Sequence, residues 1–325
     1  MHVLLKRGEK MRKINYINEY LKELFGERTL KICVDGAFTC PNRDKSKGLN
    51  GCIFCSERGS GEHLNNLLSI NDQVKAAFNS IKIQRANSFI IYFQNYSNTY
   101  DSVEVLKKKY DEAINAFIDN SKEYPDKKLV GLQIATRPDC IDEKIAKLLS
   151  DYSTKMYVAV ELGLQTANDD NNFLNRCYSN SDFENAVKTL NKYNIPVIAH
   201  IIVGLPTKSG TESHEDIINT VNFINKQNIH GLKIHSCYIV KNTILEKLYM
   251  ENKYIPITLE YYLEELSYIL THISPNLVIH RISGDAPKDI LVAPSWNTHK
   301  KLVLNGIYKL FKVENLWQGK FYEKN

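Results

Sequence analysis

Three cysteines near the start of the chain have the residue type and spacing of a metal site. Cys40, Cys52 and Cys55 lie in the run CPNRDKSKGLNGCIFC, which contains no fourth cysteine. Four cysteines close the coordination of a four-iron cluster, whereas three leave one iron free to bind another molecule. The spacing therefore indicates a reactive metal centre rather than a cluster that only transfers electrons.

Two other uses of these cysteines follow from the residues alone. Together with His63 they could form a closed zinc site of the Cys3His type. Disulfide bonds are the second alternative, but the odd total of seven cysteines argues against a disulfide framework. The other cysteines are expected to be small buried residues, too dispersed for a second cluster: Cys33, Cys140, Cys177 and Cys237.

The composition is that of an ordinary globular chain. Of its 325 residues, 43% are hydrophobic and 24% are charged, and the net charge is +5. No segment approaches the roughly twenty apolar residues that cross a bilayer. The first residues, MHVLLKRGEK, lack the pattern of a signal peptide. We therefore expect a cytoplasmic protein with reduced thiols and no membrane partner, whose mild positive charge permits an anionic partner.

Short apolar runs alternate with amphipathic stretches at the length of a βα unit. The predicted strands are 30–34, 88–93, 129–136, 156–164, 197–203 and 231–235. The predicted helices between them are 70–85, 102–118, 143–152, 181–193 and 213–227. Ser181 and Ser213 stand at positions typical of helix N-caps.

This order predicts an α/β fold with three regions. Residues 30–240 are expected to form a partial (β/α)6 TIM-like barrel of parallel strands. Residues 1–29 are expected to form an N-terminal helical lead-in, and residues 241–325 a C-terminal α+β extension packed on the barrel.

One face of strand after strand is polar, which favours a barrel over an open sheet covered by helices on both faces. Because side chains alternate along a strand, the polar set is expected to face a shared lumen. Buried ionisable groups cost several kcal/mol each unless they are paired or bound to a ligand, and active sites of such barrels form at the C-terminal strand ends. The predicted lumen residues are Tyr92, Gln94, Gln133, Arg137, Glu161, Gly163, Gln165, His200, Lys233 and His235.

Together these features resemble the radical S-adenosylmethionine (SAM) enzymes. The resemblance rests on the cysteine loop after the first strand, Phe54 just before Cys55, the GLP turn after the fifth strand and the polar lumen. The gap between the first two cysteines is longer than usual, as in the branch of the Elongator catalytic subunit, which TRPD and Asn175-Arg176 also resemble. Six motifs are similar to the YhcC/YtqA (MnmL) group of that branch: DGAFTCPNRD, GCIFCS, ATRPDC, ELGLQTAND, HIIVGLP and SGDAP.

The resemblance implies a [4Fe–4S] cluster on Cys40, Cys52 and Cys55, with SAM bound to its fourth iron. Reduction by a low-potential donor such as flavodoxin or ferredoxin would cleave SAM to a 5'-deoxyadenosyl radical. Arg176 is expected to pair with the methionine carboxylate and Gln165 to bind the ribose.

The resemblance also implies the other residues around SAM. The adenine is expected to pass the backbone from Ile202 to Gly204. The sequence departs from the family pattern at Gln94-Asn95, which replaces a GGE motif, at Ala135, which replaces a common glutamate, and at His200, which replaces an aspartate. The further residues expected to bind the cofactor are Phe54, Gln94, Asn95 and His200.

The substrate is expected across the lumen from the cluster. The predicted catalytic residues are Glu161, Lys233, His235 and Arg137. Glu161 and Lys233 could instead pair with each other. Cys140 or Cys177 could donate a hydrogen atom to a product radical.

The group resemblance implies conversion of 5-carboxymethylaminomethyl to 5-aminomethyl at the wobble uridine of tRNA. Phosphate contacts are then expected from Arg43, Lys45, Lys47 and Arg58 in the cluster loop. Two alternatives remain, radical chemistry on a small metabolite or peptide and a zinc-stabilised RNA-binding protein without catalysis. The sequence leaves the oligomeric state open.

Overall fold

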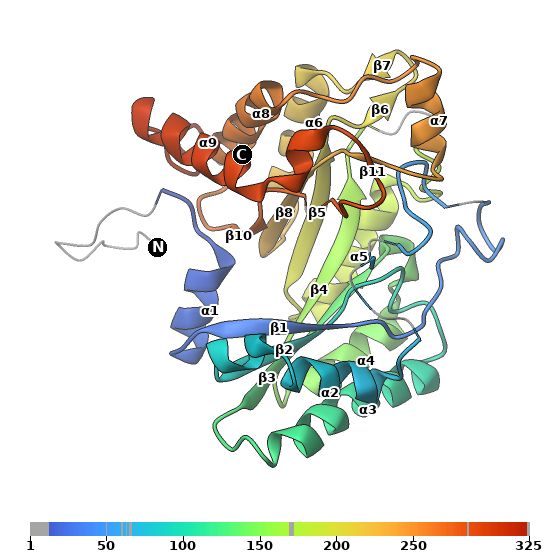
Figure 1. The fold of residues 1–325 in the computed structure, drawn as a ribbon, viewed down its shortest axis with the longest axis vertical. Helices are drawn as coiled ribbons and strands as arrows, with labels where there is room; N and C mark the ends of the chain where they lie inside the picture. The colour runs from blue at the N-terminus through green and yellow to red at the C-terminus, as the bar shows by residue number, and fades with distance from the viewer. Residues whose placement is uncertain are drawn as a thin grey trace.

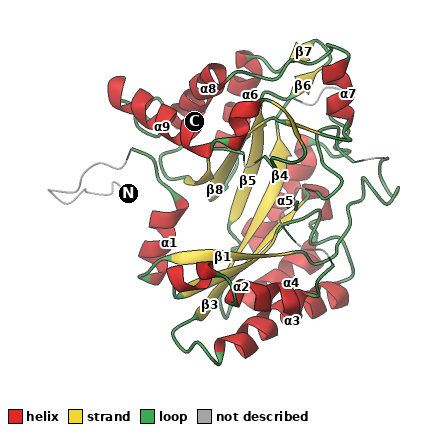
Figure 2. Ribbon diagram, viewed as in Figure 1, coloured by secondary structure: helices red, strands yellow, loops and turns green. Residues whose placement is uncertain are grey.

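Seven parallel strands form one curved sheet in the order β1-β2-β3-β4-β5-β8-β10 (Figures 1 and 2). The computed structural model describes residues 13–49, 51–59, 61, 62, 64, 67–168, 172–284 and 286–323. His63 and the first twelve residues of the lead-in lie outside this part. The strands are β1 Thr29–Val34, β2 Ser88–Phe93, β3 Lys128–Thr136, β4 Tyr157–Gln165, β5 Val197–Val203, β8 Gly231–Ser236 and β10 Val278–Arg281.

The first six of these strands match the six predicted strands to within one residue at each end, and the α/β partial barrel is confirmed. The seventh strand, β10, comes from the predicted C-terminal extension and pairs in parallel with β8. The division into 1–29, 30–240 and 241–325 stays a prediction. Because β10 joins the sheet, the extension contributes a wall of the lumen.

The edge strands β1 and β10 stand at opposite ends of the sheet order, so the barrel is open between them. Helix α1 (Ile17–Phe25) contacts both edges, and the Ile279 amide donates to the Asn15 carbonyl over 2.8 Å. The lead-in therefore bridges the two sides of this gap, as Figure 1 shows at the left of the view.

The helices that follow the strands cover the outer face of the sheet. They are α2 Ile70–Phe78, α3 Val103–Ser121, α4 Glu143–Ser153, α5 Asn180–Lys192 and α6 His214–Asn225. The predicted helix 70–85 is divided, because extended backbone at Ser80 separates α2 from the 3-10 turn Ile81–Arg85. Ser213 caps α6 as predicted. Ser181 does not cap α5, because Ser179 accepts the Asp182 amide and Asp182 in turn accepts the Ser179 amide.

The C-terminal region adds α7 Ile244–Met250, α8 Leu259–His272 and α9 Lys300–Val313. Two small antiparallel pairs lie above the strand ends, β6 Pro206–Thr207 with β7 Gly210–Thr211, and β9 Ile239–Val240 with β11 Leu291–Ala293. Among the described residues, no helix has the length and apolar character needed to span a membrane.

The main core lies between the outer face of the sheet and its helices. Burying one large aliphatic or aromatic side chain stabilises a fold by about 1.5–3 kcal/mol. The apolar residues that this face of the strands contributes are all buried in the core: Phe89, Ile91, Phe93, Leu132, Ile134, Val158, Val160, Leu162, Leu164, Ile201 and Val203. Since alternation puts their neighbours on the other face, the core fixes which side chains enter the lumen.

A second, smaller core holds the cysteine loop above the strand ends. Ile53, between the second and third cysteines, packs with Leu174, Leu205 and Leu245, which follow β4, β5 and β9. Its amide donates to the Leu174 carbonyl over 3.1 Å, and its carbonyl accepts from the Leu245 amide over 2.9 Å. The loop is thereby fixed to three separate segments of the barrel.

Candidate functional site

A cavity of about 570 Å³ occupies the lumen below the cysteine loop. Cys40, Cys52 and Cys55 all line it, and so do side chains from β1, β2, β4, β5, β8 and β10. The three cysteines therefore lie on one side of the molecule, over a shared hydrophilic lumen. Because parallel strands carry their C-terminal ends to one edge, the loop after β1 and the polar strand residues meet there.

The turn around the second and third cysteines is held by the loop itself. Gly51, with φ +75°, leads into Cys52, and the Arg43 guanidinium lies 3.2 Å from where a Cβ of residue 51 would stand. The Cys55 amide donates to the Cys52 carbonyl over 2.9 Å. Arg43 also donates to the carbonyls of Cys55 and Ser56. The positive φ therefore favours a glycine at residue 51.

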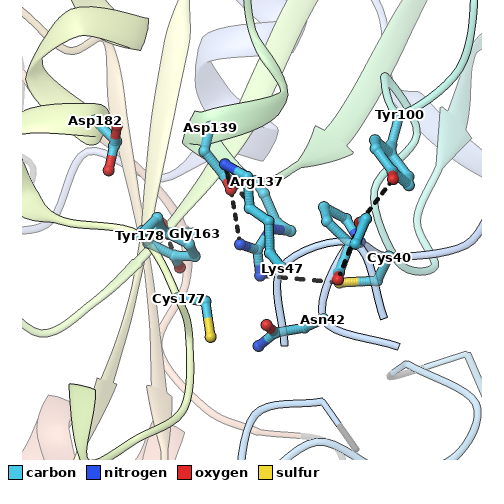
Figure 3. A network of polar contacts seen from close by, with 12 residues as sticks. Cys40, Asn42, Lys47, Tyr100, Arg137, Asp139, Gly163, Cys177, Tyr178 and Asp182 are labelled. Atoms are coloured by element: carbon cyan, nitrogen blue, oxygen red, sulfur yellow. Dashed lines mark hydrogen bonds and ion pairs between the residues drawn. The ribbon is translucent and has the colours of Figure 1, made fainter. Parts of the chain in front are cut away.

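Two side chains donate toward the cysteine sulfurs. Asn42 Nδ2 lies 3.8 Å from the Sγ of Cys52, and Arg137 Nη1 lies 3.9 Å from the Sγ of Cys40. Arg137 is fixed by Asp139, to which its Nε and Nη2 donate over 2.9 and 2.8 Å, as Figure 3 shows. Hydrogen bonds to cluster sulfurs are one of the means by which a protein sets the potential of an iron–sulfur cluster.

This donor set fits a cluster with three cysteine ligands. The three thiols face one cavity and two donors point at their sulfurs. Within the described residues, no three His, Cys, Asp or Glu side chains are placed to hold a single metal ion. His63, the fourth donor of the zinc alternative, lies outside these residues.

Five of the residues predicted to bind SAM line the cavity, and three do not. Phe54, Gln94, Gln165, His200 and Ile202 line it. The other three, which the cavity lining does not include, are Asn95, Arg176 and Gly204.

Arg176 is buried beside the end of β4 rather than in the cavity lining, with only 2% of its surface exposed. Its Nη1 donates to the carbonyls of Leu164 and Thr166, over 2.5 and 3.1 Å, and its Nη2 donates to Asn180 Oδ1 over 3.0 Å. In this structure the guanidinium therefore ties β4 to α5. Its pairing with the methionine carboxylate stays a prediction.

Asn95 and Gly204 shape the backbone at the mouth. Asn95 Nδ2 donates to the buried Asp35 over 2.8 Å. Gly204, with φ +82°, donates its amide to Glu212 over 2.9 Å and accepts the Tyr254 hydroxyl over 2.7 Å. Both residues thus hold the turns that follow β2 and β5.

Glu161 is the centre of a buried polar network in the lumen. Its Oε2 accepts from Lys233 over 2.9 Å and from the Tyr92 hydroxyl. Its Oε1 accepts from Gln133 over 2.6 Å and lies 3.5 Å from Lys31 Nζ. Burial acts to raise the pKa of Glu161, but the charges of Lys233 and Lys31 outweigh it and hold this pKa well below its usual value. The pairing of Glu161 with Lys233 is confirmed.

His200 on β5 and His235 on β8 form a second group in the lumen. Their ring centroids are 4.4 Å apart, and both rings line the cavity. The Nε2 of each is buried and has no hydrogen-bond partner among the described residues. Burial, with Lys233 nearby, lowers the pKa of His200 to about 3, and burial holds the pKa of His235 well below its usual value. Both imidazoles are therefore neutral.

Arg137, also predicted as a catalytic residue, lies apart from this group. It contacts Cys40 at the mouth, and its guanidinium stacks on the Tyr178 ring with a distance of 4.7 Å to the centroid. The predicted substrate residues therefore divide into Arg137 beside the cysteine loop and Glu161, Lys233 and His235 on the strands β4 and β8.

Most of the basic residues predicted to contact phosphate are used within the cluster loop. Arg43 and Arg58 donate to loop carbonyls, and Lys47 pairs with Asp139 over 2.7 Å. Lys45 is exposed. The two cysteines considered as hydrogen-atom donors, Cys140 and Cys177, are not part of the cavity lining.

Several cavity residues were missed by the sequence interpretation. Tyr178 donates to the Gly163 carbonyl over 2.9 Å, at the wall between β4 and the cysteine loop. Arg281 lies on β10, a strand that was not predicted, because its run VIHRI does not alternate between apolar and polar residues. Further lining residues that were not expected are Cys33, Cys237 and Tyr238.

Two protein-family models match the chain. Residues 46–224 match the radical SAM superfamily, and residues 229–312 match the radical SAM C-terminal domain. The boundary between the matches lies before β8, so the second match includes the strands β8 and β10.

Individual relatives agree with these matches. The uncharacterised protein YtqA of Bacillus subtilis is 33% identical over 95% of this chain and 92% of its own length. A tRNA uridine(34) acetyltransferase of Dehalococcoides mccartyi is 30% identical over 49% of this chain and 34% of its own length. The solved structure of Elp3 from the archaeon Methanocaldococcus infernus shares the fold with a TM-score of 0.66 and 18% identity, over 89% of this chain and 64% of that one. The chain therefore belongs to the radical SAM superfamily, and as a radical SAM enzyme it uses a [4Fe–4S] cluster and SAM.

Proposed function

We propose that this protein modifies the wobble uridine of tRNA, converting a 5-carboxymethylaminomethyl group to 5-aminomethyl. The observation that carries the proposal is that three cysteine thiols and a polar lumen share one cavity. One relative supports the choice of substrate. It is named as acting on tRNA uridine 34, and it is 30% identical over 49% of this chain.

In this proposal Cys40, Cys52 and Cys55 hold the cluster, with SAM at its open iron. When bound, the pair supplies a 5'-deoxyadenosyl radical after one electron from a low-potential donor such as flavodoxin or ferredoxin. Asn42 and Arg137 hydrogen-bond the cysteine sulfurs, and Gln165 at the end of β4 holds the ribose.

The lumen residues then hold the substrate and exclude water from the radical. The proposed substrate residues are Glu161, Lys233 and His235, all of which line the cavity, with Arg137 at its mouth. A reactive radical must meet its target C–H bond directly, so a narrow lumen with fixed side chains is the surrounding it requires.

The cofactor part of the proposal is tested by anaerobic purification. We expect iron and sulfide in the wild type and 5'-deoxyadenosine when SAM and reductant are added. C52A should lose the iron and this product, whereas the matched control C177A, which removes a cysteine outside the cavity lining, should keep both. Zinc in place of iron would support the RNA-binding alternative instead.

The substrate part is tested on RNA. Nucleoside analysis of tRNA from a strain lacking the gene should show the 5-aminomethyl product missing and its precursor accumulated. The purified enzyme should restore the product on that tRNA, and binding should weaken as salt rises because phosphate contacts release counterions. An unchanged nucleoside profile in the deletion strain would remove tRNA as the substrate.

A further inference from the structure

We propose that His200 and His235 form one binding site for the Watson–Crick edge of the substrate base, by accepting its N3–H and donating to a neighbouring carbonyl. This inference rests on the proposed function and adds to it the group of the substrate that the lumen recognises.

The first step of the argument is position. His200 and His235 lie on the adjacent parallel strands β5 and β8, where His200 pairs with Lys233 and His235 pairs with Ile202. Their ring centroids are 4.4 Å apart in the cavity wall. Two imidazoles at this separation can contact neighbouring atoms of a single planar ring.

The second step is their lack of partners. The buried Nε2 of each ring has no hydrogen-bond partner among the described residues. Nearly all buried polar atoms in proteins are hydrogen-bonded, so a polar group of a ligand is the expected partner in a cavity of this size. The contrast is direct, because Glu161 in the same lumen has three donors within hydrogen-bond distance and a lysine at 3.5 Å.

The third step is chemical type. Each neutral imidazole offers one N–H donor and one nitrogen acceptor, whereas a charged imidazolium can only donate. Burial and the Lys233 charge keep this pair neutral. A carboxylate or phosphate can use only the N–H of a neutral ring and leaves the acceptor nitrogen without a partner. The imide of uracil presents an N–H between two carbonyl oxygens, which matches one acceptor and one donor.

The fourth step is the position of the pair relative to the expected SAM site. His200 lies three residues before the end of β5 at Val203, which is about 10 Å at 3.3 Å per residue, whereas His235 pairs with Ile202. The backbone expected to pass the adenine, at 202–204, therefore lies above His200 and beside His235. The cavity also reaches both edge strands, through Cys33 on β1 and Arg281 on β10. Enzymes that act on a base commonly take it out of its stack.

The test uses the cluster-loaded full-length enzyme and two anticodon stem-loop RNAs. One carries 5-carboxymethylaminomethyluridine at the wobble position, and the other carries the same nucleoside methylated at N3. We expect the wild type to bind the N3-methylated RNA at least about tenfold more weakly, since a buried acceptor is left without its donor. This comparison requires no mutation of the protein.

Substitution then locates the discrimination. H200F and H235F keep a ring of similar size and remove the polar atoms, so each should bind both RNAs with nearly equal affinity. H272F is the matched control, because His272 stacks on Tyr268 with ring centroids 3.9 Å apart and is not part of the cavity lining. It should keep the wild-type preference and the wild-type rate of SAM cleavage without RNA.

The outcomes are distinguishable. Equal binding of the two RNAs by the wild type, or a preference that survives in H200F and H235F, would overturn the inference and leave the proposed function standing. A preference that is lost together with SAM binding in H200F and H235F would assign the pair to the cofactor and also overturn it. If neither RNA binds, both the inference and the tRNA proposal fail.

Discussion

Two glutamates in different regions of the molecule are almost equally buried, yet they titrate in opposite directions. Glu161 in the lumen is 3% exposed, and its pKa is held well below its usual value against the effect of burial by Lys233 and Lys31. Glu212 beside the turn after β5 is 5% exposed, and burial raises its pKa to about 8. Glu212 accepts the Gly204 amide over 2.9 Å, and no cation is among the causes of its shift.

The difference teaches that burial alone does not decide the charge of a carboxyl group. Burial disfavours the charged form at both sites, and only the nearby ammonium groups reverse this effect at Glu161. The two pKa shifts therefore have opposite effects on how stability depends on pH. Glu161 stabilises the fold above its usual pKa and loses that contribution as pH falls. Glu212 stabilises the fold most below its usual pKa and loses that contribution as pH rises toward 8.

Removing Lys233, the cation beside Glu161, should change the unfolding free energy the most. K233M leaves a buried carboxylate without its closest ammonium, and breaking a buried pair in this way costs about 3–5 kcal/mol of unfolding free energy. Urea unfolding measures it, with the exposed Lys188 on α5 as a matched control, K188M. The double variant E161Q/K233M should recover part of the loss. A K233M stability equal to that of K188M would show that the pair contributes nothing.

Replacing Glu212 by glutamine should have an intermediate effect on the unfolding free energy. Because the folded protein keeps this proton up to about pH 8 while the unfolded chain loses it near 4.5, wild-type stability should fall with pH. The slope is at most about 1.4 kcal/mol per pH unit, so E212Q should gain about 2 kcal/mol relative to wild type between pH 6 and pH 7.5. Parallel stability curves for the two proteins would place the Glu212 pKa outside this window.

The smallest effect is expected at the second cation near Glu161. Lys31 lies 3.5 Å from the carboxylate, and its side chain is 26% exposed. Partly exposed pairs are screened by solvent, so K31M should lower the unfolding free energy by less than about 1 kcal/mol. Added salt should reduce this loss of unfolding free energy. The loss caused by K233M should depend less on salt. A loss as large as that of K233M would mean that the two lysines act as one unit.

The sequence alone predicted which side chains of the barrel strands face the lumen and which face the helices. Alternation along six strands placed Glu161, His200 and His235 in the lumen, and the same alternation placed the core residues outside. The cysteine motif after the first strand predicted that the three cysteines lie at the same end of the barrel as the polar strand ends. Both patterns are local and periodic, so each can be read from one segment at a time.

The parts that were missed depend on contacts between distant segments. Strand β10 has only four residues, and nothing local distinguishes it from the rest of the C-terminal region, so Arg281 was not expected in the lumen. Arg176 followed the family pattern but donates to backbone carbonyls at Leu164 and Thr166. The choice of Ser179 over Ser181 as a cap was decided by hydrogen bonds with Asp182.

The order of the strands has a consequence for how this scaffold can diversify. The cysteine loop follows β1 at one border of the sheet, while β10 closes the other border and comes from a separate part of the chain. Changes in β10 can therefore reshape the far wall of the chamber, because the cysteine loop is fixed through Leu174, Leu205 and Leu245 and not through this strand. The same cysteine loop could in this way serve substrates of different size when only the β10 side of the sheet changes.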